Sequence, residues 1–183
     1  MRRSRLFPER RATAAVEMAL ISPLVLILLA GIIDFGRMLH DKLKLASVVA
    51  SAGEYALLSA ASINSGNGAT LAATLGGIVA NSNGAAWAGA AVTVNAGPSS
   101  VVANGATTPS GTAANADRCW CPTGNPGSWA WGAAATCGTA CAGGTLAGKF
   151  VSVTGSRSFS AIFGHYGLIS DRVLRENTIV QAQ

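Results

Sequence analysis

The sequence predicts an α+β fold, in which a long N-terminal transmembrane helix continues into a small antiparallel β-sheet head with disulfides. Three observations predict it: an uncharged apolar run near the N-terminus, apolar residues at helical spacing after that run, and alternating strand patterns near the C-terminus. The chain has 183 residues, of which 50% are hydrophobic and 11% are charged. It is therefore too short for two ordinary domains and too apolar for a disordered protein.

The net positive charge is concentrated at the N-terminus. The formal net charge of the chain is +5, and a net charge of +4 lies in its first eleven residues, which contain Glu9 and the arginines Arg2, Arg3, Arg5, Arg10 and Arg11. The rest of the chain is nearly neutral. A neutral body lacks the electrostatic surface that binds DNA or RNA, so we expect no nucleic-acid partner.

The apolar run predicts a membrane anchor. Residues 18–33 contain no charged side chain and, with the small residues before them, reach the ~20 residues that a membrane-spanning helix needs. Because arginines precede the run, we expect the N-terminus in the cytoplasm and the remaining chain exported. A cleavable signal peptide has the same charged start and apolar middle, but cleavage after Ala30 would place Leu28 where a small residue is needed. A retained anchor is favoured.

Helical periodicity continues beyond the apolar run. One apolar stripe is formed by Leu39, Leu43, Ala46, Val49, Ala50, Gly53, Ala56 and Leu57. We therefore expect a single helix over residues 13–61, with a kink or local melting at Pro23, where proline removes a backbone hydrogen bond. The stripe is suited to pack on the sheet of its own head or on the helix of a partner, and the sequence does not choose between them.

The head is predicted in two regions, 62–118 and 119–183. In the first we expect a short helix over Thr70–Ala80 and a strand over Ala91–Asn95, followed by turn-rich residues 99–116 that suit a flexible linker or ordered structure equally. In the second we expect a strand that begins at Phe150 and extends toward Ser160, an apolar loop over Ile162–Leu168, and a final strand over Arg172–Val180.

Four cysteines form two closely spaced pairs, Cys119 with Cys121 and Cys137 with Cys141. In the cytoplasm this spacing would suit zinc, whereas export to an oxidising compartment favours disulfides. A bridge within the first pair is sterically poor, which leaves crossed or nested bridges between the two pairs. We therefore expect two disulfides and no metal.

The remaining aromatic and titratable residues do not predict an enzyme. Trp120, Trp129 and Trp131 suit either a ligand platform or the filling of a small core beside the disulfides, and the second is favoured. The histidines, His40 and His165, and the neighbouring Tyr166 form no recognisable catalytic or metal-binding spacing. We expect no catalytic residue and no cofactor.

The order of features around the apolar run resembles the TadE-like family of the Tad (Flp) pilus system. These features are the basic leader, a small-residue stretch that ends in Val16-Glu17, an apolar run interrupted by Pro23, and the exit sequence Asp34-Phe35-Gly36-Arg37. The resemblance covers residues 10 to about 61. It implies a type IV pilin-like subunit.

The resemblance also implies a site of processing. In such proteins a membrane-embedded prepilin peptidase removes the basic leader, and glutamate is the fifth residue of the mature chain. Counting back from Glu17 places the cut between Ala12 and Thr13, so residues 1–12 would be the leader. The family commonly has glycine before the cut, where this chain has Ala12.

Glu17 is expected to govern assembly. A charge inside an apolar helix is costly and usually functional, and the free amino group of Thr13 would need a counter-charge where subunits bury their helices together. The expected function is a minor pilin or pseudopilin anchored in the bacterial inner membrane, with an exported head that is periplasmic or extracellular. Its expected partners are other pilin-like subunits in a hetero-oligomer, the peptidase and the lipid bilayer. The alternative is an anchored or secreted adhesin that binds through the tryptophan-rich loop.

Overall fold

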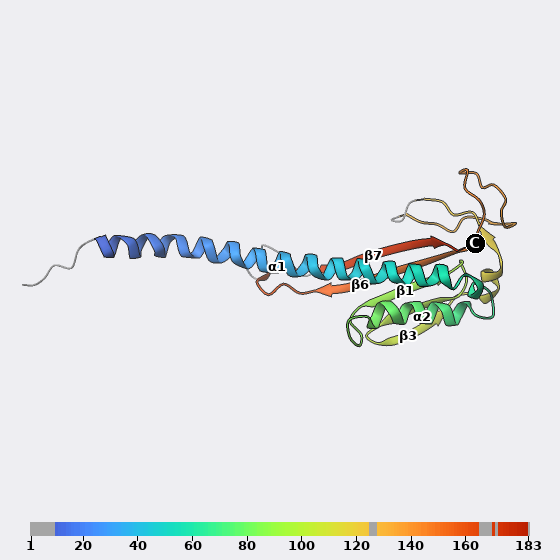
Figure 1. The fold of residues 1–183 in the computed structure, drawn as a ribbon, viewed down its shortest axis with the longest axis horizontal. Coiled ribbons are helices and arrows are strands. Elements are labelled where there is room, and N and C mark those ends of the chain that lie inside the picture. The colour runs from blue at the N-terminus through green and yellow to red at the C-terminus, as the bar shows by residue number, and fades with distance from the viewer. Residues whose placement is uncertain (1–9, 125–127, 165–169, 171, 183) are drawn as a thin grey trace, which may run out of the picture. The chain divides into compact units, whose positions relative to one another are not determined.

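A computed structural model of the chain describes residues 10–124, 128–164, 170 and 172–182 (Figure 1). The helices are α1 (Arg10–Leu58) and α2 (Gly68–Asn81), with short 3₁₀ turns at Ala60–Ser62 and Ala113–Asp117. The strands are β1 (Gly89–Val94), β2 (Ser99–Ala103), β3 (Ala106–Ser110), β4 (Cys119–Trp120), β5 (Ala134–Ala135), β6 (Phe150–Phe159) and β7 (Arg172–Gln181). The predicted α+β class is confirmed.

The chain divides into two compact units. One contains Met1–Leu39 and Ser160–Asp171, and the other contains His40–Phe159 and Arg172–Gln183. The first unit therefore holds the apolar part of α1 and the loop between β6 and β7, and the second is the head.

The long helix α1 runs from Arg10 to Leu58 and includes Pro23. The structure has the expected helix, but α1 ends at Leu58, and the last two of the expected residues 13–61 belong to the 3₁₀ turn Ala60–Ser62. In the described part of the chain, α1 is the one helix that is long and apolar enough to cross a membrane, judged by length and composition.

The head is built on a five-stranded antiparallel sheet with the order β3-β2-β1-β6-β7. The central pair, β1 and β6, aligns Val92 with Val153 and Val94 with Val151. All four valines are almost fully buried. Alternation along both strands places these side chains on one face of the sheet, which is the face that the helices cover.

A glycine allows the helices to approach this face. A Cβ atom added to Gly155 of β6 would lie 2.7 Å from Cγ2 of Val49 and 2.9 Å from Cδ1 of Leu45, both on α1, and 3.3 Å from Cγ1 of Val79 on α2. Within the head, α1 and α2 thus pack on the same side of the sheet (Figure 1). The helix α2 packs mainly on β1 and β2.

The predicted stripe on α1 is only partly correct. The buried residues of α1 in the head include Leu45, Val49, Ala52 and Ala56, whereas Leu43 is 62% exposed and Leu57 is 45% exposed. Leu39 and Ala50 are also exposed. The stripe therefore contains two faces: its Val49, Gly53 and Ala56 pack on the sheet of the same chain, and its leucines do not. Sequence periodicity alone does not separate these faces, because apolar residues recur at helical spacing on both of them.

The region after α2 is ordered. Residues 99–110 form the hairpin β2–β3, closed by Asn104 and Gly105, which both have positive φ. This decides the open question on residues 99–116, which contain paired strands and a 3₁₀ turn. The expected short helix and first strand are confirmed as α2 and β1, and the two C-terminal strands as β6 and β7. The predicted loop Ile162–Leu168 is described up to Gly164. His165 and Tyr166 lie outside the described residues, as does the leader up to Glu9.

Candidate functional site

The first turns of α1 present an apolar surface. The large side chains from Val16 to Ile33 are mostly exposed, with Leu20 at 75% and Leu28 at 58%. A helix that exposes leucine and isoleucine on all sides is stable only where the surrounding medium is itself apolar. This part of α1 fits a membrane anchor.

Glu17 is an exposed residue of this apolar surface, and Thr13 is exposed one helical turn before it. The peptide bond between Ala12 and Thr13 lies within α1, which begins at Arg10. The structure therefore places the predicted processing position and Glu17 on one continuous helix.

Asp34 holds the loop between β6 and β7 against α1. Its side chain is 3% exposed. Its Oδ1 accepts a hydrogen bond from the backbone N–H of Ile162 (3.0 Å), and its Oδ2 accepts one from Phe163 (2.8 Å). The guanidinium of Arg37, one turn later, lies 3.6 Å from Oδ1. An ionised carboxylate that accepts two backbone hydrogen bonds forms a strong attachment. The sequence showed Asp34 only as part of the exit motif, because its partners lie 128 and 129 residues further along the chain.

Two disulfides connect the cysteine pairs. Cys119 bonds to Cys137, and Cys121 bonds to Cys141. The bridges are thus crossed, which decides between the two arrangements that the spacing allowed. Among the residues that the structure describes, no group of three or more His, Cys, Asp or Glu side chains is placed to hold a metal ion.

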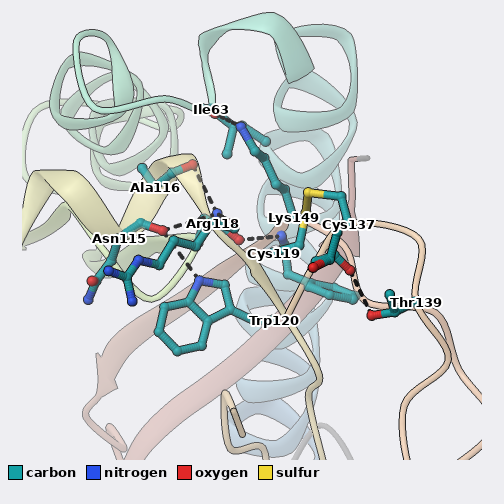
Figure 2. The surroundings of a disulfide bond; sticks show 12 residues. Ile63, Asn115, Ala116, Arg118, Cys119, Trp120, Cys137, Thr139 and Lys149 are labelled. Carbon is teal, nitrogen blue, oxygen red and sulfur yellow. Dashed lines mark hydrogen bonds between the residues drawn. A yellow bond between two sulfur atoms is a disulfide. The ribbon is translucent and has the colours of Figure 1, made fainter. Parts of the chain in front are cut away.

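Hydrogen bonds connect the disulfide region to the rest of the head (Figure 2). The indole N–H of Trp120 donates to the carbonyl of Asn115, and Nζ of Lys149 donates to the carbonyl of Ile63 at 2.7 Å. Asn95 is fully buried; its Nδ2 donates to the carbonyl of Ala116 at 3.0 Å, and its Oδ1 accepts from the N–H of Phe150. These bonds satisfy backbone groups that would otherwise be buried without partners.

Asp117 makes a similar attachment at the surface of the head. Its Oδ1 accepts a hydrogen bond from the backbone N–H of Ser65 at 2.9 Å. Hydrogen bonds from the side chain and then the backbone of Ser65 favour the ionised carboxylate and lower the pKa of Asp117 below its ordinary value of 3.8.

The tryptophans fill space beside the sheet. The rings of Trp129 and Trp131 meet edge to face with centroids 5.7 Å apart, and Trp129 also contacts the ring of Phe150 at 5.6 Å. Phe150 is buried at the start of β6. Such pairs are typical of core packing, so the geometry favours a structural role for Trp129 over a free ligand platform.

Comparison with known protein families gives a match for most of the N-terminal helix α1. The model of a family described as TadE-like protein matches residues 12–53. This segment of the chain is similar to the TadE-like family. The resemblance that the sequence indicated is thus confirmed, and no match was found among curated proteins or solved structures. The TadE-like segment supports a component related to the Tad pilus, and the family is structural rather than enzymatic.

The TadE-like segment contains both acidic residues discussed above for α1, Glu17 and Asp34. It ends where α1 packs on the sheet, at Gly53, whose added Cβ would lie 3.0 Å from Cγ2 of Thr178. The match therefore covers most of α1 and does not include the disulfide region.

Proposed function

We propose that this chain is a structural or assembly component of a Tad (Flp) type IVc pilus, a minor pilin or pseudopilin anchored in the bacterial inner membrane. In this proposal residues 1–12 are the leader, residues 13–61 form the anchor and its extension, and residues 62–118 and 119–183 form the exported head. The observation that carries the proposal is the match of residues 12–53 to the TadE-like family, on a helix with an exposed apolar surface.

A second face of α1 supports assembly with other helices. Leu43, Ala50 and Leu57 are exposed and follow one another at seven-residue spacing. At roughly 100° per residue, this line is turned by about 120° around α1 from Leu45 and Val49, which pack on the sheet. A helix with one face used and a second apolar face at heptad spacing suits a partner helix. We infer that other pilin-like subunits supply it, in a hetero-oligomer.

The basic leader supports an N-terminus in the cytoplasm, because arginines are retained on that side of the membrane. In this orientation a prepilin peptidase would cut between Ala12 and Thr13, and the disulfide-bonded head would be exported. Crossed disulfides agree with an oxidising compartment.

Glu17 has a physical role in this proposal. After cleavage, the ammonium group of Thr13 begins a helix that is surrounded by apolar side chains. A carboxylate from a neighbouring subunit lowers the cost of burying that charge, and the ion pair sets the axial register between the two helices.

The test is the replacement of Glu17 in a strain that depends on this chain for pili. Glu17→Gln and Glu17→Leu are expected to abolish or strongly reduce pili at an unchanged amount of membrane-bound protein. Glu54→Gln is the matched control, because Glu54 is also exposed on α1 but lies outside the TadE-like segment; it should form normal pili. Normal pili from the Glu17 variants would contradict the role of this residue.

N-terminal sequencing of the membrane-bound protein tests the processing. Thr13 is the expected first residue. A chain that begins at Met1 would show an anchor that keeps its leader, and a chain that begins at Gly31 would show a signal peptide and overturn the proposal. Intact pili with lost adhesion after deletion of the gene would favour a binding module instead.

A further inference from the structure

The loop between β6 and β7 forms an apolar groove with α1. Within the first unit, Phe163 and the helix residues Pro23, Leu26, Ala30 and Ile33 line a groove of about 530 Å³. Its described lining contains no charged side chain. All of the helix residues that line it fall within the uncharged run of residues 18–33, and all of them except Ala30 are exposed.

The groove lies at a defined level of the helix. Asp34 is the first charged residue after the apolar run, and it holds the N–H groups of Ile162 and Phe163. The loop is therefore attached where the apolar part of α1 ends. Arg37 follows Asp34 by one turn and is half-exposed, so its positively charged side chain lies at the end of the apolar part of α1, beside the attached loop.

The loop exposes apolar side chains at this level. Ile162 is 62% exposed, although it is adjacent to a residue that packs on α1. On the helix, Ile32 and Ile33 are 68% and 47% exposed. Apolar side chains of residues 160–164 and of the helix are thus exposed at the same level of α1, although the two segments lie more than 120 residues apart in sequence.

We propose that residues 160–164 are a second membrane contact, in which Ile162 and Phe163 enter the bilayer at the end of the span marked by Asp34 and the groove holds a lipid acyl chain. A lipid is the occupant that fits, because the groove is continuous with the surface that faces the hydrocarbon and is lined by apolar side chains. Arg37 lies where lipid phosphates would be, as expected for an arginine at the end of a span. The proposal rests on the proposed membrane anchor.

The energetic reason is the transfer of exposed apolar area out of water. An apolar side chain that enters the interfacial region gains free energy in proportion to the area it buries. Asp34 contributes by satisfying the two backbone N–H groups that the loop would otherwise bring unpaired into a medium without water.

The test uses the full chain reconstituted in phosphatidylcholine vesicles, with and without bromine on the acyl chains, because bromine quenches tryptophan emission on contact. One tryptophan is added at a time, by Ile162→Trp or Phe163→Trp, and because the chain has four tryptophans of its own, the emission of the added one is taken as the difference from the unsubstituted chain in the same vesicles. Leu28→Trp reports the span itself. Val101→Trp, on a 46% exposed residue of the sheet, reports the head.

At positions 162 and 163 the emission of the added tryptophan is expected to fall to about half or less in brominated vesicles, as at position 28, because interfacial residues reach the acyl boundary. No quenching is expected at position 101. Quenching at 28 without quenching at 162 and 163 would overturn the lipid contact and leave the anchor intact. A blue-shifted but unquenched tryptophan at 163 would overturn it in favour of a protein partner. Absence of quenching at 28 would contradict the proposed anchor itself.

Discussion

The two ends of α1 both carry large apolar side chains but place them in different environments. In the first unit the helix exposes its leucines and isoleucines, and in the head the same helix buries Leu45, Val49, Ala52 and Ala56. The difference is that the head supplies a sheet with a glycine, Gly155, that admits these side chains. Apolar side chains without such a partner surface in their own chain indicate that another apolar medium covers them.

The sharpest test of this difference compares two leucines. Leu45→Ala removes a fully buried side chain and is expected to lower the free energy of unfolding of the head by about 2–5 kcal/mol, as is typical of a cavity in a packed core. Leu28→Ala removes a side chain that is 58% exposed and should change it by less than about 0.5 kcal/mol.

Urea unfolding of the full chain in detergent, followed by circular dichroism, measures both variants. Equal destabilisation by the two substitutions would contradict the distinction between the ends of α1.

Two aspartates provide the next comparison, because each unit uses one to hold a backbone N–H group. Asp34 is buried, whereas Asp117 is exposed. Asp34→Asn leaves one acceptor oxygen for two N–H donors, at a cost of about 1–3 kcal/mol for the unsatisfied group. We expect amide hydrogen exchange at Ile162 and Phe163 to become about tenfold faster or more.

The matched control is Asp117→Asn, read at the amide of Ser65. Water replaces the lost interaction there, so the change in exchange should be smaller than for the loop. A larger effect at Ser65 than at Phe163 would show that burial does not set the strength of these attachments.

The smallest expected effect is the acid dependence of the head. Because the pKa of Asp117 is lowered in the folded chain, its ionised form stabilises the head at pH values above the ordinary pKa of 3.8. This contribution is lost as the pH falls through 3.8 toward the lower pKa of the folded state. Asp117→Asn should therefore reduce the change in the urea midpoint between about pH 6 and about pH 3. An unchanged pH profile would contradict the role of the bond to Ser65.

Much of the fold could be predicted because its signals are local. The presence of α2, β1, β6 and β7 follows from periodicity and turn residues near each element, although α2 and β1 each begin two residues before their expected starts. The hairpin β2–β3 was less certain, since its uncharged Ala, Ser and Thr residues also suit a linker. It is ordered because β2 pairs with β1 along its length, for example Val102 with Ala90.

The sequence indicated some residues of the candidate site together with their roles, and others without their partners. Glu17, Ala12 and Thr13 were found from the order of features along the chain, and their roles stay predictions. The cysteines were found, but their pairing was not, because the spacing alone allowed two arrangements. Asp34 was noted only within a motif, since nothing near it in sequence shows that the N–H groups of Ile162 and Phe163 are its partners.

The sequence by itself determined that α1 is long and apolar enough to cross a membrane and that the net positive charge of the chain is concentrated before the span. These properties depend on composition over a short stretch of chain. The tertiary structure decided which side of α1 meets the sheet, which cysteines bond, and that Asp34 holds a loop from the far end of the chain. These depend on register and packing between distant segments, and a local pattern carries no information about the partner that a side chain will meet.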